Sequence, residues 1–551
     1  MPNSPFSRRI LAVVSAPLLS SLVLATPPVS PASAAPAGQS QEIGEGGDTC
    51  VLGPRANCRD VVDPWDVKFH GDLTGAKFAR AQLDGADLRG ADLDRANLRG
   101  VDLRDANLKR ASLRGADFRP ARDPQGNPRS TPSCAPDCQS ANLSDADLSN
   151  ADLTNANLSG ANLAGATLAN ANLSGAKLTG ASLTGADLTG ADLSGAILDR
   201  AILARTVLTA VSSGGVSGTP VVLPNGWKLL KGFFVGPRAN LDEADLSGVN
   251  LTGLDLTGAY FRGADLSGAT LESVQARDAN FTRADLTGAK MFDAGFMAAI
   301  LLSANLAGAD ARAAVFGGAV LTNARLDGAD LTGAYLLGVM SGGIKGNPRL
   351  DSWIRLVDGY LLAPGVQLPD LDLRKGTDLS GLDVSGADLS RLSGESIELS
   401  GADLSSARLA QAKLPRVDMG GVYAPGINLT GANLSSASVT GVLKNAQLQG
   451  AMLAQATFNG ADLSGANLTG ADAYGDPREG YVRASFREAN LVGARLTNGK
   501  FKLTMFEDAD LTGADLTGAD LTGALLSGAK LSGVIWSNTT CPDGTVTNTG
   551  C

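Results

Sequence analysis

A five-residue period runs through most of this chain and constrains its fold more than any other feature. Between Ala141 and Leu208 the sequence reads ANLSD ADLSN ADLTN ANLSG and continues in the same way with few breaks. A leucine stands at the centre of each unit, an alanine two residues before it, and a small polar residue between them. A period of five fits neither the roughly 3.6 residues of a helical turn nor the alternation of a strand, because either would scatter these leucines over every face. We therefore expect the chain to turn a corner once per unit, so that every leucine points inward.

The spacing of the aromatic residues favours a coil with four sides. Phenylalanines that replace leucine at the centre of a unit recur at intervals of twenty residues, namely Phe261 with Phe281, Phe296 with Phe316, and Phe486 with Phe506. If four units make one turn, the members of each pair stack directly over one another. A three-sided coil would favour a shorter interval, so we expect a square coil.

The bulk composition agrees with a narrow repeat array rather than with several globular domains. The 551 residues include 68 glycines, and only 5% of the residues are aromatic. This supply fills the thin continuous core of a stacked repeat, not the broad core of an enzyme domain. The formal net charge of −10 disfavours a nucleic-acid partner, because binding to phosphates needs an excess of lysine and arginine.

Residues 1–34 have the features of an export signal peptide. Arg8 and Arg9 form a positively charged start, an apolar stretch follows at 10–25, and residues 32–34 form a small-residue cleavage site. A short membrane anchor is the alternative, but prolines within and behind the apolar stretch disfavour it. The paired arginines leave twin-arginine export open beside ordinary secretion. We expect a secreted, extracellular protein with no integral membrane segment after cleavage.

The six cysteines also favour an oxidising destination. They form three couples that are close in sequence and lie outside the repeat runs, namely Cys50 with Cys58, Cys134 with Cys138, and Cys541 with Cys551. We expect these couples to form three disulfide bonds. A zinc site that combines the Cys134 couple with another couple is the alternative, but no histidine lies nearby.

Breaks in the period divide the chain into solenoid segments, insertions and caps. The expected order is a signal peptide at 1–34, an N-terminal cap at 35–70, a first solenoid segment at 71–210 with a loop insertion at 119–140, a hairpin insertion at 211–240, a second segment at 241–339, a second hairpin insertion at 340–368, a third segment at 369–537 with an insertion at 474–482, and a disulfide-closed C-terminal cap at 538–551. Caps are expected because the end of a solenoid exposes unpaired strand edges.

The two hairpin insertions share several sequence elements. Each has a Gly-Gly pair, a Gly-x-Pro step, a tryptophan, and a two-residue turn between apolar residues, which is Lys231-Gly232 in the first and Asp358-Gly359 in the second. Such turns between apolar runs predict β-hairpins. Trp227 and Trp353 are candidate interaction residues, because an indole ring can stack on a ligand. The favoured interpretation is that they belong to the apolar core of the hairpins.

Units such as Ala514-Asp515-Leu516-Thr517-Gly518 resemble the A(D/N)Lxx signature of the pentapeptide repeat family, and such units fill most of the chain. The tail, with Cys541 followed by Pro-Asp-Gly, is similar to the ends of exported bacterial members. The resemblance implies an all-β fold: a right-handed quadrilateral β-helix in two or three segments separated by the β-hairpin insertions. Packing leads to the same fold, since leucine or phenylalanine fills the core, alanine lets the wall approach closely, and Gly, Ser, Asn and Asp suit the turns.

No residue pattern in the chain indicates catalysis. The sequence has no Walker-type loop, no G-x-S-x-G elbow, no H-E-x-x-H motif and no EF-hand loop. His70 is the one histidine, and nothing near it in sequence forms a nucleophile–base pair. Aspartates are frequent because they fill one repeat position, and no Asp-rich loop indicates the oxygen cage of a calcium site. We therefore predict no enzyme activity, no catalytic, cofactor-binding or metal-binding residues, and no cofactor.

Three non-enzymatic interpretations remain. The favoured one is a secreted structural or interaction scaffold whose flat faces bind an unknown protein or cell-envelope component. The second follows from the resemblance: some family members mimic duplex DNA and bind type II topoisomerases such as gyrase, which protects these enzymes from quinolones. The export signal, the mixed charge and the disulfide-type tail disfavour a DNA mimic here. The third is a surface- or ice-binding protein, but the outward column Ser144, Ala164, Thr184, Ala204 is not the threonine ladder that it needs.

Overall fold

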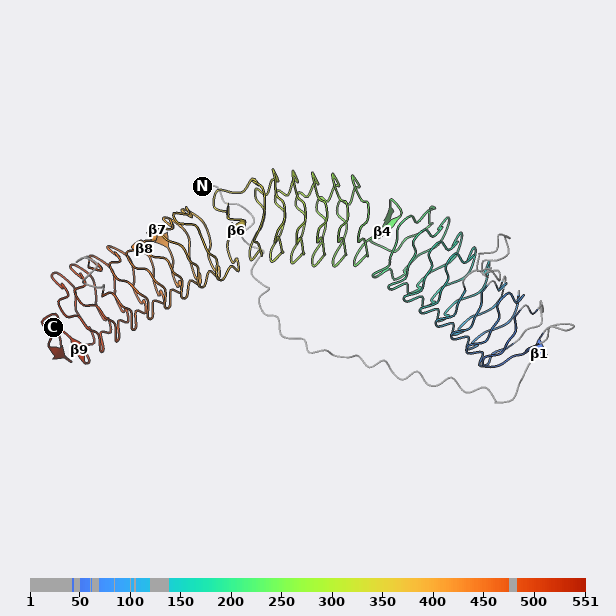
Figure 1. Ribbon diagram of the computed structural model, residues 1–551, viewed down its shortest axis with the longest axis horizontal. Coiled ribbons are helices and arrows are strands. Elements are labelled where there is room, and N and C mark those ends of the chain that lie inside the picture. The colour runs from blue at the N-terminus through green and yellow to red at the C-terminus, as the bar shows by residue number, and fades with distance from the viewer. Residues whose placement is uncertain are drawn as a thin grey trace.

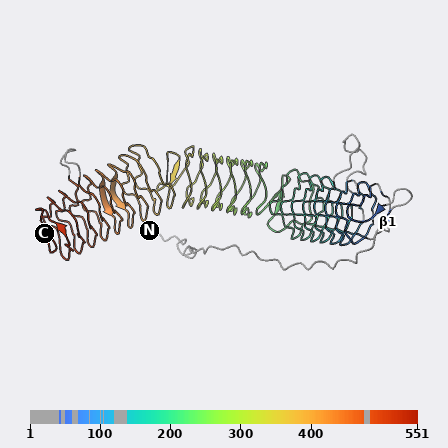
Figure 2. The same cartoon turned by 60° about the horizontal axis from the view of Figure 1, so that its bottom comes forward.

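The chain folds into a long right-handed quadrilateral β-helix, as predicted. The computed structural model describes residues 42–43, 50–59, 61, 69–83, 85–99, 101–103, 106–118, 138–474 and 483–551. Figures 1 and 2 show three solenoid segments in sequence order, joined into one arched rod. The axis of the rod changes direction near β4 (Phe233–Val235) and again near β6 (Tyr360–Leu362), within the two hairpin insertions.

One repeat unit shows why the sequence needs its residue types. The N–H groups of Asn162, Leu163 and Gly165 donate to carbonyl oxygens of the neighbouring coils at distances between 2.7 and 3.0 Å. The N–H of Ala166 donates to the Leu163 carbonyl at 3.1 Å and closes the corner. The remaining N–H, that of Ala164, donates to Oδ1 of Asn162 at 3.2 Å. The Asp or Asn of a unit therefore supplies the one acceptor that the stacked backbone does not provide.

The last residue of a unit takes a left-handed backbone conformation. The φ angle is 69° at Gly165 and 58° at Asn155. Glycine adopts this conformation without steric strain, and asparagine tolerates it better than most residues. The frequent Gly or Asn at the end of a unit follows from this backbone requirement.

Regular strands are short in the described part of the chain, because each side of a coil contributes a single bridging residue to its ladder. Four antiparallel pairs join β1 (Glu42–Ile43) with β2 (Cys50–Val51), β3 (Lys228–Leu230) with β4, β5 (Arg355–Val357) with β6, and β9 (Thr539–Thr540) with β10 (Val546–Thr547). The longer strands β7 (Asp418–Tyr423) and β8 (Ser438–Val442) pair in parallel. The rest of the solenoid consists of parallel bridges between residues that mostly lie twenty apart.

The ladders stay aligned across the insertions. Asn107 bridges Asn142, which lies 35 residues later, and Ser212 bridges Asn240, which lies 28 residues later. The columns therefore continue past both interruptions of the period. Residues 119–137 and 475–482, which contain most of the two predicted loop insertions, lie outside the described residues, as does the predicted signal peptide at 1–34.

The predicted aromatic stacks are present in the core. The ring centroids lie 4.7 Å apart for Phe261 and Phe281, and 5.3 Å apart both for Phe296 with Phe316 and for Phe486 with Phe506, with nearly parallel planes. Stacking at an interval of twenty residues means that each coil has four units. The aromatic spacing in the sequence thus identifies the number of sides correctly.

Both predicted hairpins are present, and their turns are built alike. The φ angles are 49° and 81° at Lys231 and Gly232, and 48° and 83° at Asp358 and Gly359. Two positive φ angles are typical of a type I′ turn, which matches the twist of the flanking strands. The turn glycine also packs closely, because a Cβ atom on Gly232 would lie 2.9 Å from the backbone nitrogen of Gly215.

The first hairpin divides the hydrophobic core, whereas the second does not. Phe234 belongs to the core of the first segment and Val235 to the core that continues through the rest of the chain. Neighbouring strand residues point to opposite faces, so β4 forms a wall between two cores. Leu361 and Leu362 in β6 belong to one and the same core, which runs on to Trp536.

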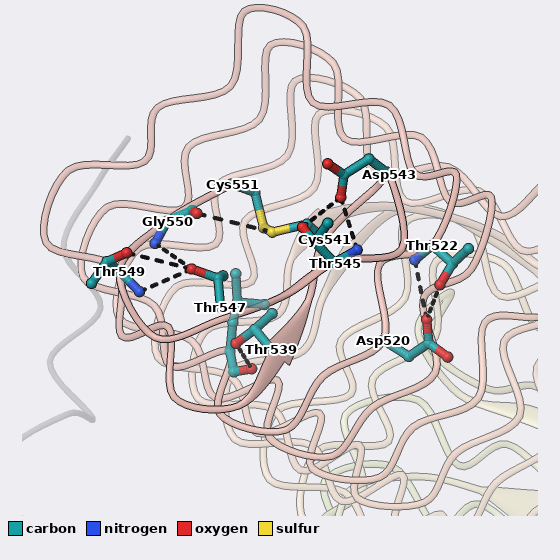
Figure 3. The surroundings of a disulfide bond; sticks show 11 residues. Asp520, Thr522, Thr539, Cys541, Asp543, Thr545, Thr547, Thr549, Gly550 and Cys551 are labelled. Atoms are coloured by element: carbon teal, nitrogen blue, oxygen red, sulfur yellow. Dashed lines mark hydrogen bonds between the residues drawn. A yellow bond between two sulfur atoms is a disulfide. The ribbon is translucent and has the colours of Figure 1, made fainter.

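Disulfide bonds close both ends of the described chain. Cys50 bonds to Cys58 and Cys541 to Cys551, with S–S distances of 2.02 and 2.07 Å. Figure 3 shows the C-terminal cap, in which Oδ1 of Asp543 accepts the N–H and the hydroxyl of Thr545 close to the disulfide.

The third predicted disulfide involves Cys134, which lies outside the described residues. Its predicted partner Cys138 is buried, and its N–H donates to the carbonyl of Asn157 at 2.9 Å. In the unit that follows Cys138, the N–H of Leu143 donates in the same way to the carbonyl of Asn162. Cys138 therefore occupies a core position of the coil that leucine fills elsewhere.

Candidate functional site

The two predicted interaction residues do not occupy equivalent positions. Trp227 directly precedes β3 and is partly buried against both cores, whereas Ile354 takes this place before β5. Trp353 lies one residue earlier and is 40% exposed. The interpretation of both tryptophans as hairpin core is therefore wrong for Trp353. The physical reason is that one residue, the buried Ile354, separates Trp353 from its strand, whereas no residue separates Trp227 from its strand.

An apolar patch on the second segment is the more extensive candidate for an interaction site. Two adjoining ladders run through it, one from Gly295 through Val315 to Tyr335 and the other from Ile300 through Val320 to Met340. Apolar residues occupy these two ladders at outward positions where many other units carry Asp or Asn. We define the apolar patch by its large side chains, which are Met297, Ile300, Leu302, Val315, Val320, Tyr335, Leu337 and Met340.

Six side chains of the apolar patch are exposed to solvent, and those of Val315 and Val320 are half-buried. The exposed fractions reach 46% for Tyr335, 43% for Leu337 and 44% for Met340, although the apolar residues of the core beneath are buried. The ring of Tyr335 lies close to Gly317, where an added Cβ would be 3.1 Å from the ring. Because contiguous apolar surface on a soluble protein marks sites of interaction, the patch is a candidate binding surface.

The charge distribution around the coil sets the apolar patch apart. Over the coils that carry the patch, the chain has no charged residue at 294–309, 313–324 and 331–344. Most charged residues of these coils lie on the other two faces, in the ladders Lys290, Asp310, Asp330, Arg349 and Asp285, Asn305, Arg325, Lys345. The others, Asp293, Arg312 and Asp327, lie outside the ladders. In cross-section, these coils therefore have two uncharged faces that carry the apolar patch and two faces that carry most of the charge. The charged faces border the patch on both sides.

Sequence reasoning missed the apolar patch, although a signal was present. The uncharged runs recur about every twenty residues, and that interval equals one coil. Apolar residues that recur at outward positions with this interval indicate one continuous face.

Ion pairs between neighbouring coils cover much of the remaining described surface. Examples are Arg262 with Asp242 at 2.5 Å, Arg487 with Glu507 at 2.7 Å and Lys530 with Asp510 at 3.1 Å. These pairs are solvent-exposed, so each stabilises the fold only slightly. The pairing also means that acidic side chains do not form one uninterrupted anionic face in these coils.

Hydrogen bonds at the corners lower the pKa of several aspartates. Bonds from Ser247 and Lys231 lower the pKa of Asp245 to about 2, and a bond from Ser380 is the main cause that lowers the pKa of Asp378 to about 2. Hydroxyl groups of Thr332 and Thr545 act in the same direction on Asp330 and Asp543.

These shifts predict how stability depends on pH. A carboxylate whose folded-state pKa lies below the ordinary value of 3.8 stabilises the fold at higher pH, and this contribution disappears as the pH falls from about 4 to about 2. We expect the melting temperature to stay level between about pH 7 and 5 and to fall below about pH 4. Thermal unfolding followed by circular dichroism checks this, and a melting temperature that stays constant down to about pH 2 would contradict it.

The remaining candidates for chemistry in the described part of the chain are a metal site and a cavity. Among the described residues, no three His, Cys, Asp or Glu side chains come together as ligands for a metal ion. One cavity lies inside the core at the start of the third segment, where coils of 21 residues widen it. Apolar side chains such as Leu371, Leu379 and Val384 line it completely, so it has no group to orient a polar ligand. No helix in the described ranges could cross a membrane.

Comparison with protein families identifies the repeat. A family model described as pentapeptide repeats (8 copies) matches residues 71–105, 81–119, 141–180, 168–205, 239–274, 261–294, 299–336, 442–475 and 506–539. Together these matches cover about half of the chain. No curated protein matches the sequence.

Several solved structures are similar to the chain. HetL, a pentapeptide repeat protein involved in heterocyst differentiation regulation from the cyanobacterium Nostoc sp. strain PCC 7120, is 25% identical over 55% of this chain and 93% of its own, with a TM-score of 0.15. A pentapeptide repeat protein from the Arabidopsis thaliana thylakoid lumen is 33% identical over 23% of this chain and 68% of its own, with a TM-score of 0.12. QnrB1, a plasmid-mediated fluoroquinolone resistance protein, is 18% identical over 52% of this chain and 93% of its own, with a TM-score of 0.15.

Proposed function

Because the chain belongs to the pentapeptide repeat family, we propose that it is an exported, non-enzymatic interaction scaffold that binds a protein or cell-envelope partner through the apolar patch. The observation that carries this proposal is the exposure of large apolar side chains on two adjoining, uncharged faces of the second segment. A fold whose outward positions are normally Asp, Asn, Ser and Thr has no structural need for them there.

The rigidity of the solenoid suits the apolar patch to binding. The backbone bonds between coils continue under the patch, where the N–H groups of Ile300, Val320 and Met340 donate to the preceding coil at 2.9 Å. The surface is therefore fixed before a partner arrives. Binding to a pre-organised surface loses little conformational entropy. A larger part of the free energy gained by burying apolar surface therefore contributes to affinity.

A substitution that introduces a charge into the apolar patch tests this function. We expect Leu337→Asp to weaken capture of the partner from envelope fractions by about tenfold or more, because a carboxylate in a desolvated apolar contact loses its hydration. The matched control is Val492→Asp, which changes a side chain of similar exposure (39%) at the same position of a repeat in the third segment. Quantitative mass spectrometry of the captured proteins measures the ratio, and equal capture by both variants would contradict a role for the patch.

Export is the second part of the proposal. The signal-like residues 1–34 and the disulfides at Cys50 and Cys541 support it, because disulfides persist in oxidising compartments. Fractionation of the native producer, with mass spectrometry of the N-terminus, should find a mature chain that starts near Ala35 outside the cytoplasmic membrane with oxidised cysteines. An uncleaved, reduced protein in the cytoplasm would overturn this part and favour the DNA-mimic interpretation, for which gyrase inhibition is the assay.

A further inference from the structure

One ladder of the second segment changes the sign of its charge along the rod. Parallel bridges connect its members one coil after another, in the order Asp245, Asp265, Asp285, Asn305, Arg325 and Lys345. We call this column the graded ladder. It has three carboxylates in the N-terminal half, a neutral residue at Asn305 and two cations in the C-terminal half. The other three ladders of the segment show no such order.

Most charges of the graded ladder are not neutralised within the described chain. Among the described residues, Asp265, Asp285 and Lys345 form no ion pair, and Arg325 lies 3.3 Å from Asp327 on its own face. Asp245 at the end of the ladder binds Lys231 of the first hairpin at 3.0 Å. The ladder thus presents negative charge at one end and positive charge at the other on one flat face.

Such a ladder is complementary to itself when two copies meet antiparallel. The two-fold axis of such a dimer lies in the plane of the contact, perpendicular to the rod, and passes Asn305. It places Asp285 opposite Arg325 of the second copy and Asp265 opposite Lys345 of the second copy. The symmetry forms each contact twice, so four opposite-charge pairs arise. A parallel, in-register arrangement would instead place every charge against a like charge.

Leu302 gives this contact an apolar centre. It stands at the corner beside Asn305, is 36% exposed and would meet its own copy near the axis. An apolar centre with charged residues around it is the usual composition of a protein interface. We propose that the second segment binds a second copy of this chain, antiparallel, through the graded ladder. This proposal uses a different face from the main part of the apolar patch and does not rest on the proposed function.

The dimer should be weak and sensitive to salt. Exposed ion pairs are individually weak, and salt screens them over about 10 Å at 0.1 M. Sedimentation analysis of the full chain should show a monomer–dimer equilibrium whose dissociation constant rises about tenfold or more between about 50 and 500 mM sodium chloride. A chain that stays monomeric at the lower salt concentration, at protein concentrations of about 100 μM, would overturn the proposal.

Charge-reversed variants test whether the graded ladder is the contact. Asp265→Lys/Asp285→Lys makes the ladder positive at both ends, and Arg325→Asp/Lys345→Asp makes it negative at both ends, so each variant alone should be monomeric. An equimolar mixture of the two should form dimers at least as readily as the wild type. Lysine is compatible with ladder positions, since Lys177 and Lys290 occupy them. Asp265→Lys/Asp285→Lys loses the acceptors for the N–H groups of Ser267 and Thr287 and should melt at a lower temperature, so a retained cooperative thermal transition is the measure that the variants fold. A mixture that stays monomeric, or a variant that dimerises alone, would exclude the graded ladder as the dimer contact.

Cysteine cross-linking tests the antiparallel register. Mixed under oxidising conditions, Asp285→Cys and Arg325→Cys should form a disulfide-linked heterodimer, and neither should form one efficiently alone. Self-linking of Asp285→Cys would indicate a parallel contact and would contradict the proposal. If the ladder variants form dimers and Leu337→Asp does not, self-association takes place through the apolar patch. That result would overturn the proposal for the graded ladder and would leave the proposed function unaffected.

Discussion

Phe281→Ala is expected to lower the free energy of unfolding by about 3–5 kcal/mol. The ring is fully buried, stacks on Phe261 at 4.7 Å and meets Phe296 edge-on at 5.5 Å. The substitution removes these contacts and leaves a void, because the neighbouring coils are held by their backbone ladders and collapse little. Urea denaturation followed by circular dichroism measures the loss.

Phe292→Ala is the matched control in the same segment. Phe292 is 47% exposed at a corner, with the guanidinium of Arg312 6.0 Å from its ring centre. Its removal should change the free energy of unfolding by no more than about 0.5 kcal/mol, as is usual for surface positions. Equal effects of the two substitutions would contradict the stacked aromatic core.

Gly232→Ala should destabilise the protein by about 2–4 kcal/mol through the first hairpin. Gly232 has a φ angle of 81°, and an added Cβ would lie 2.9 Å from the nitrogen of Gly215 and 3.1 Å from that of Val216. Both contacts are with backbone, so rotation of a side chain cannot relieve them. The neighbouring loop would have to move, and the 3.2 Å hydrogen bond from the N–H of Val216 to the Gly232 carbonyl would be lost.

Gly253→Ala separates the effect of this contact from that of the backbone conformation. Gly253 has a φ angle of 68°, but an added Cβ meets nothing within 4 Å. Only the left-handed conformation opposes alanine there, which costs about 1–2 kcal/mol. Thermal unfolding of both variants should show the larger loss for Gly232→Ala, and the reverse order would mean that the hairpin does not pack on Gly215 as described.

The square section and the stacking register could be predicted because both depend on repetition. A unit of five with leucine inside requires a corner per unit, and the pairing of Phe261 with Phe281 fixes four units per coil. The hairpin turns could be predicted because Asp358-Gly359 meets a backbone requirement that few residue pairs satisfy. In each case one local rule acts without competition from distant contacts.

The features that could not be predicted depend on how distant parts meet. Phe234 and Val235 are both apolar, and nothing in their identity indicates that they face two different cores. Trp353 is exposed because Ile354 stands between it and its strand, whereas Trp227 directly precedes its strand. Outward positions accept almost any side chain, so the apolar patch and the graded ladder become visible only when residues twenty apart are placed side by side.

Site-specific photo-cross-linking in the native producer tests most directly whether the rigid solenoid binds its partner through the apolar patch. A photoreactive phenylalanine derivative replaces Leu337 in one strain and Val492 in another, two exposed corner positions on different segments. We expect a discrete adduct with another protein or envelope component at position 337 and none at position 492. Adducts at 492 but not at 337, or the same adducts at both, would contradict it.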